Sequence, residues 1–265
     1  MTAMAGSTDG TTGATSGVFR GLRRYNLIAA ALHAAQAVAV LLLANGFSLP
    51  VTATYMTGPP GTPPGEPTTL FDIRIAWGVA AFFALSALAH LVVASPLFFR
   101  RYVEGLRRHR NVFRWVEYSL SASLMMVLIA QIVGITDVAA LTAIFGVNAA
   151  MILFGWLQER YEEPGNGRWL PFVFGCIAGI VPWIAVAIYL LQPGSVTPVQ
   201  PPGFVYGIFV SLFVLFNIFA VNQWMQYRPI GRWSDYLVGE RAYVTLSLVA
   251  KSLLAWQVFA GTLAS

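Results

Sequence analysis

Long runs of apolar residues, broken by short polar segments, dominate the pattern along the chain. A helix rises about 1.5 Å per residue, so about 20 apolar residues are needed to cross the roughly 30 Å hydrocarbon core of a bilayer. No segment alternates with the two-residue period of a membrane β-barrel. The pattern therefore predicts an all-α membrane protein, a single seven-transmembrane-helix bundle over residues 20–265. The runs are Tyr25–Ala44, Ile75–Ala94, Trp115–Gly134, Val138–Leu157, Trp169–Leu191, Gly203–Met225 and Ala242–Leu263.

Two segments outside these runs have a distinct composition. Residues 1–19 begin with Gly, Ser, Thr and Ala and contain no apolar core segment, which predicts a disordered tail. Segment 45–70 contains TGPPGTPPGEP, whose Pro and Gly residues forbid a helix, beside the β-prone stretch SLPVTATYM. We expect a strand or short hairpin in this long loop between the first two helices.

Charge is scarce and unevenly placed. Charged residues make up 10% of the chain, against about 25% in a soluble domain, which excludes a soluble globular enzyme. Of the 15 arginines, 14 lie on one side of the predicted spans and only Arg74 lies on the other. Because cytoplasmic loops retain positive charge, this predicts a cytoplasmic amino terminus, an extracellular carboxyl terminus and an extracellular 45–70 loop, in the plasma membrane. The basic excess is a topology signal, so nucleic-acid binding is not indicated.

Several function classes have no support in the sequence. A single cysteine excludes a disulfide framework and a cysteine-based zinc cluster. The chain has no nucleophile elbow, phosphate loop or metal-ligand cluster. We therefore expect neither an enzyme nor a metal site.

Two charged residues lie within predicted spans, where charge is costly and faces the bundle interior. Lys251 is the only lysine and lies in the middle of the seventh span, while Glu117 lies early in the third. One interpretation is a structural ion pair that fixes helix packing. The other is that a buried amine forms a Schiff base with an aldehyde, and the resulting cation needs a nearby carboxylate. Their depths differ by roughly 10 Å along the spans, a gap that the long lysine stem reduces.

Further polar residues lie in the same half of the bundle as Glu117. His33 and His90 fall at similar depths, and Ser86 and Ser247 lie one turn from His90 and Lys251 on matching helix faces. A membrane histidine is commonly a helix–helix hydrogen-bonding group. Two histidines beside a carboxylate instead favour a hydrated polar cavity able to hold or relocate a proton.

The other half of the bundle is apolar and aromatic. Spans five and six carry Trp183 and Phe216 within an aromatic stripe, which is typical of core packing but also suits a long conjugated cofactor. Asn148 and Met151 are expected to line the same pocket, with Ser121 beside the cofactor. This half contains no charged residue within the spans, which argues against an ion pump.

The arrangement resembles a retinal-binding rhodopsin, and the inverted orientation makes it similar to the heliorhodopsin family. The likeness covers nearly everything from Tyr25 to Leu263. It rests on the strings TYMTGPPGT, FRWVEYSL, AIFGVNAAMILFGWLQE, FGCIAGIVPW, PGFVYGI and GERAYVTLSLVAKSLLAWQ.

The resemblance implies all-trans retinal bound to Lys251 as a protonated Schiff base, with Glu117 as its single counterion. It also implies that Ser247 hydrogen-bonds near the Schiff base and that His33 and His90 belong to a polar cavity on the cytoplasmic side. The family forms homodimers to which the loop between helices 1 and 2 contributes. Proton-pumping rhodopsins carry acids at the places of Leu128 and Ser247, and their lack here argues against directional transport.

Three functional hypotheses follow. The first is a retinal photoreceptor in which photoisomerisation drives a conformational change without ion pumping, with the bilayer, retinal and a second copy of the chain as partners. The second is a light-driven or light-gated ion (proton) transporter that uses Glu117, His33 and His90 as relays. The third is regulation of a cytoplasmic signalling partner through the arginine-rich loop Arg100–Arg114, whose simpler interpretation is a topology determinant that contacts anionic lipid.

Overall fold

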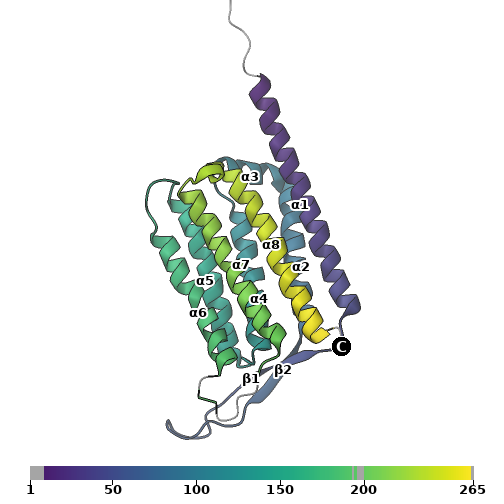
Figure 1. Ribbon diagram of the computed structural model, residues 1–265, viewed down its shortest axis with the longest axis vertical. Helices are drawn as coiled ribbons and strands as arrows, with labels where there is room; N and C mark the ends of the chain where they lie inside the picture. Colours follow the sequence, from purple (N-terminus) through teal and green to yellow (C-terminus); the bar gives the residue numbers. More distant parts are fainter. Residues whose placement is uncertain (1–8, 193, 196–199, 264–265) are drawn as a thin grey trace, which may run out of the picture.

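The computed structural model describes residues 9–192, 194–195 and 200–263, and most of them are helical. Within these residues, seven helices are long and apolar enough to cross a membrane, as predicted. α1 packs against α2 and α8, and the contacts continue from α2 through α4, α5, α6 and α7 to α8, so that the helices form a closed bundle (Figure 1). The long helices are α1 (Asp9–Leu43), α2 (Ile75–Ala94), α4 (Val112–Ile132), α5 (Val138–Tyr161), α6 (Leu170–Leu191), α7 (Gly203–Tyr227) and α8 (Tyr236–Val258).

A short helix, α3 (Pro96–Arg107), lies across one end of the bundle, which we call the α3 end (Figure 1). Its start is fixed by Ser95, whose hydroxyl accepts a hydrogen bond from the backbone N–H of Phe98, and by a proline at the first helical position. Tyr102 and Leu106 are buried, while the arginines of α3 point outward. The sequence analysis treated this segment as a loop because a 12-residue amphipathic helix has no long apolar run.

A two-stranded antiparallel hairpin lies at the opposite end, which we call the hairpin end (Figure 1). β1 (Ser48–Ala53) pairs with β2 (Thr68–Arg74), and the register shifts between Val51 and Thr52. The backbone N–H of Thr52 donates to Thr136 O at 2.9 Å, which ties β1 to the turn between α4 and α5. The predicted hairpin in segment 45–70 is confirmed, and β2 extends it to residue 74.

The start of the chain differs from the sequence-based expectation. Residues 1–8 of the expected disordered tail lie outside the described residues, but α1 is already helical from Asp9. No proline interrupts residues 9–24, and adding residues to an existing helix costs far less than nucleating one. The first helix therefore extends back through residues 9–19, and α1 projects beyond the other helices at the α3 end (Figure 1).

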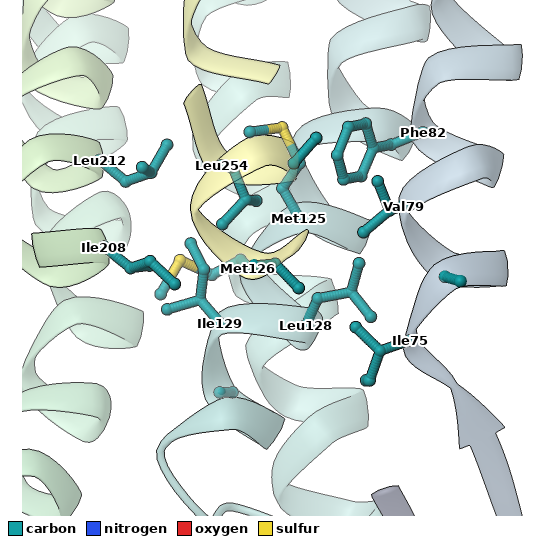
Figure 2. Packing of buried hydrophobic residues seen from close by; sticks show 14 of the residues in the cluster. Ile75, Val79, Phe82, Met125, Met126, Leu128, Ile129, Ile208, Leu212 and Leu254 are labelled. Atoms are coloured by element: carbon teal, nitrogen blue, oxygen red, sulfur yellow. The ribbon is translucent and has the colours of Figure 1, made fainter. Parts of the chain in front are cut away.

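The hairpin half of the bundle is filled by a single apolar cluster. Met125, Met126 and Ile129 of α4 lie between α2 on one side and α7 on the other, with Leu254 of α8 among them (Figure 2). Phe82 of α2 is fully buried against this group. Two short elements complete the fold: η1 (Gly231–Ser234) precedes α8, and η2 (Phe259–Leu263) extends α8 as a π-helical turn whose last carbonyl accepts from Asn45 N.

Candidate functional site

The two charges predicted inside the spans meet in the bundle interior. Lys251 Nζ of α8 lies 3.0 Å from Glu117 Oε1 of α4, and the residues are 3% and 9% exposed. Asn111 caps the start of α4 and Asp235 caps the start of α8, so both helices begin at the α3 end. The lysine stem bridges the difference in depth that the sequence predicted. The two opposite charges are buried together and balance each other.

Hydroxyl groups from three helices surround this pair. Lys251 Nζ donates to Ser247 Oγ at 2.7 Å, one turn earlier on α8. Ser86 Oγ of α2 donates to Glu117 Oε1 at 2.6 Å. Ser121 is fully buried one turn after Glu117, and its hydroxyl has no hydrogen-bond partner among the described residues. The ammonium also lies 5.2 Å from the centre of the Tyr118 ring, a cation–π contact that the sequence did not indicate.

Lys251 lines a mostly apolar cavity of about 180 Å³. Met151, Trp183, Phe216 and Ser247 line it, as expected from the sequence. Trp183 follows the intrahelical Pro182 and is packed edge-on by the aromatic stripe of α7, including Phe216 at 5.4 Å between ring centres. Phe213 and Phe219 of the predicted aromatic stripe also line it. Other lining residues were not singled out from the sequence, among them Tyr118, Met125, Phe172 and Tyr243.

Two residues expected at this cavity lie elsewhere. Asn148 is fully buried, but its amide donates to Ser123 Oγ of α4 at 3.1 Å, so it faces α4 and does not line the cavity. Ser121 is on the α4 face near Glu117 and does not line it either. A helical spacing fixes which residues share a face but not which neighbour that face meets, so the expectation for Asn148 as a cavity-lining residue is corrected here.

The predicted histidines lie side by side at the α3 end of the ion pair. The rings of His33 and His90 stack with centres 5.6 Å apart and planes 9° apart. His33 is fully buried, and neither of its ring nitrogens has a hydrogen-bond partner among the described residues. His90 Nδ1 lies 2.8 Å from Asn26 Oδ1 of α1. His90 and Glu117 also line a small cavity of about 30 Å³, which has room for one or two waters.

A buried ionic cluster closes the α3 end of this cavity. Arg114 of α4 forms salt bridges with Glu159 of α5 and with Glu240 of α8, and its side chain is 4% exposed. Tyr236 and Trp115 donate to Glu159 at 2.6 Å and 2.5 Å. With one arginine and two carboxylates the cluster carries one excess negative charge. The sequence did not reveal this cluster, because Arg114 is there one of several arginines in the loop Arg100–Arg114.

Together these contacts define what the site can do chemically. A buried primary amine lines a cavity whose other lining residues are mostly aromatic and aliphatic, with a carboxylate in contact. Such an amine can condense with an aldehyde, and the carboxylate can balance the resulting cation. The cavity suits an elongated apolar molecule with one reactive end.

Comparison with known protein families agrees with this geometry. The heliorhodopsin family model matches residues 22–263, which is most of the chain, so the chain belongs to the heliorhodopsin family. No curated protein matches it. Membership implies a retinal-binding, light-sensing rhodopsin in a family that is generally non-enzymatic.

Proposed function

We propose that this member of the heliorhodopsin family is a light sensor that carries all-trans retinal on Lys251, with Glu117 as the counterion, and that it does not pump ions. The observation that carries the proposal is the 3.0 Å contact between Lys251 Nζ and Glu117 Oε1, with Lys251 lining a mostly apolar cavity of about 180 Å³. Retinal bound there supplies absorption of visible light and an isomerisation of its polyene.

The residues present fit this cofactor. Lys251 offers the only lysine amine of the chain, and its carbon stem reaches the cavity from α8. Trp183 and Phe216 supply flat apolar walls. An aldehyde carried on an apolar chain therefore meets a single primary amine and a mostly apolar lining, as retinal requires.

The neighbouring polar groups hold the charge in place. Glu117 stabilises a positive charge at Lys251 Nζ, and Ser86 fixes the carboxylate through a hydrogen bond of 2.6 Å. Ser247 Oγ lies 2.7 Å from the nitrogen and orients it toward the carboxylate. Movement of this nitrogen away from Glu117 would leave both the nitrogen cation and the carboxylate uncompensated in a buried setting. This favours transfer of the proton from the nitrogen to an acceptor, either Glu117 or a group of the adjacent cavity lined by His90.

Sensing is favoured over pumping by the contrast between the two halves of the bundle. At the α3 end, the small cavity, the histidines and the ionic cluster offer several groups that can accept a proton. At the hairpin end, the described parts of the helices hold no charged side chain in their interior, and the space between α2, α4 and α7 is filled by Met125, Leu128 and Ile129. A proton displaced from the site therefore has acceptors on one side only.

Orientation and assembly belong to the same proposal. The arginine excess at the α3 end supports an orientation in the plasma membrane with the amino terminus and α3 in the cytoplasm and the hairpin outside the cell. Leu70 and Phe71 of β2 and the neighbouring Tyr55 and Met56 are exposed on the hairpin side. An apolar surface of this kind outside the membrane supports a homodimer that uses the hairpin.

The cofactor attachment is tested by reducing the illuminated, retinal-loaded protein with borohydride and locating the adduct by peptide mass spectrometry. We expect the retinyl adduct on Lys251. The Lys251→Ala variant loses the visible band, whereas the adjacent control Ser252→Ala keeps it. A visible band that persists in purified Lys251→Ala, or an adduct elsewhere, overturns the assignment.

A further inference from the structure

A continuous buried hydrogen-bond chain leads from the histidine pair to the ionic cluster. His90 Nδ1 lies 2.8 Å from Asn26 Oδ1, and Asn26 Nδ2 lies 3.5 Å from the Tyr102 hydroxyl. The Tyr102 hydroxyl donates to Glu240 Oε1 at 3.1 Å, and Glu240 is salt-bridged to Arg114. Four helices, α1, α2, α3 and α8, contribute to these contacts before the chain reaches α4.

Tyr102 is the member of this chain that belongs to the short helix α3. Its residue is 2% exposed, and its ring packs against Phe99 and Phe113. Burial, and then the charge of Glu240, raise the pKa of Tyr102 well above its usual range, so the hydroxyl keeps its proton and donates it to the carboxylate. The same oxygen can accept a hydrogen bond from Asn26, so the hydroxyl links the histidine pair to the ionic cluster.

Direct hydrogen bonds between described residues link His90 to the cluster through Asn26. The hydrogen bond that His90 makes within the described residues is to Asn26, while the stacked His33 has no hydrogen-bond partner there. Asn26 Nδ2 is also held by Leu22 O at 2.9 Å, so the amide cannot turn without changing its contact with Tyr102. A change in the charge or position of His90 therefore alters the contact between Asn26 and the Tyr102 hydroxyl.

The hydrogen-bond chain can affect the exposed outer face of α3 through Tyr102. This helix buries only Tyr102 and Leu106 and presents Arg100, Arg101 and Arg107 on its exposed face. A 12-residue helix held by so few buried side chains has low local stability, which is typical of elements that move in a response. Loosening the contact at Tyr102 changes how α3 is held against the bundle end.

We infer that Tyr102 is a positioning residue that couples the state of His90 to α3, through its paired contacts with Asn26 and Glu240. This inference rests on the proposed light-sensing function. It identifies α3 as the element that transmits the response from the transmembrane helices to the surface of the protein. Tyr102 acts through other residues and does not touch the cofactor cavity at Lys251.

The test measures amide deuterium uptake of the α3 peptide in full-length, retinal-loaded protein, in the dark and under continuous illumination. In the wild type, light increases uptake over residues 96–107. Tyr102→Phe, which removes only the hydroxyl, loses that light-induced increase. The control Tyr25→Phe removes another tyrosine hydroxyl between α1 and α8, which lies 2.6 Å from Thr245 Oγ1, and keeps the increase.

A second variant separates coupling from simple anchoring. Asn26→Ala breaks the link to His90 but leaves the hydrogen bond between Tyr102 and Glu240, so we expect unchanged dark uptake and loss of the light-induced increase. Because the two residues act in series, the double variant loses nothing further. If Tyr102 only anchors α3, Tyr102→Phe raises dark uptake and the increase survives in Asn26→Ala.

The inference is overturned if the wild type shows no light-induced change at α3, if both variants keep it, or if Tyr25→Phe loses it equally. These results are distinguishable from failure of the proposed function. If the proposed function fails, the wild-type protein never forms a visible band. If only the role of Tyr102 fails, the visible band in the dark is intact in the wild type and in every variant.

Discussion

Replacing Arg114 by Gln is expected to destabilise the protein more than any other single charge removal at the α3 end. Arg114 is the sole cation between two carboxylates, Glu159 and Glu240, whose residues are 4% and 1% exposed. The substitution raises the excess negative charge of the cluster from one to two. Removing one partner of a buried ion pair costs about 3–5 kcal/mol, because the remaining charge is left uncompensated.

The structure also orders the related variants. Glu240→Gln leaves a neutral pair of Arg114 and Glu159, so it costs less than Arg114→Gln. The exposed pair Arg100–Glu104 on α3 is the matched control, with side chains 90% and 53% exposed. Breaking it with Arg100→Gln costs at most about 1 kcal/mol, since solvent screens an exposed pair.

The assay is reversible unfolding in mixed micelles with increasing denaturing detergent, followed by circular dichroism. An Arg114→Gln protein whose free energy of unfolding falls by no more than that of Arg100→Gln refutes the reasoning. So does a Glu240→Gln protein that is less stable than Arg114→Gln. Either result means that the cluster does not hold α4, α5 and α8 together electrostatically.

Three further predictions concern the site and the topology. Glu117→Gln keeps the side-chain shape but removes the charge 3.0 Å from Lys251 Nζ, so both the absorption maximum and the titration midpoint of the visible band move; wild-type values exclude Glu117 as the counterion. Gly179→Val lowers retinal loading, because a Cβ at this position clashes with Met151 Sδ and pushes that side chain into the cavity. Loading is measured as the ratio of visible to protein absorbance. The control Gly146→Val, whose Cβ meets nothing within 4 Å, loads normally, and equal loading of the two variants contradicts this prediction. An epitope tag at the carboxyl terminus binds antibody on intact cells and one at the amino terminus binds only after permeabilisation, and the reverse pattern contradicts the orientation.

The seven spans and the hairpin were predictable because their signals are local. Runs of about 20 apolar residues have few alternative structures, and the Pro-Gly segment after SLPVTATYM can only turn the chain. α3 was not predictable in the same way, because its helix shows in the spacing of Tyr102 and Leu106 and not in a continuous apolar run. The helical start at Asp9 was hidden by a Gly- and Ser-containing composition that is typical of tails.

The site was predictable where scarcity of charge pointed to it. Lys251 and Glu117 stand out because a charge inside a span needs a partner, and the structure joins them. Glu159 and Glu240 lie near helix ends, where sequence alone does not tell whether a carboxylate faces water or the interior. Their burial depends on Arg114 from a third helix, and such a contact between helices is set by the tertiary structure. The same limit explains Asn148, whose neighbour Ser123 was not deducible from spacing.

The most direct test of the central claim is the absorption spectrum of the purified protein expressed with all-trans retinal, recorded before and after hydroxylamine under illumination. The account predicts a visible band that bleaches as the retinal oxime forms, and no such band in Lys251→Ala. A well-folded wild-type protein that never acquires a visible band contradicts it. Lys251 and Glu117 are then a structural ion pair that fixes the packing of α4 against α8.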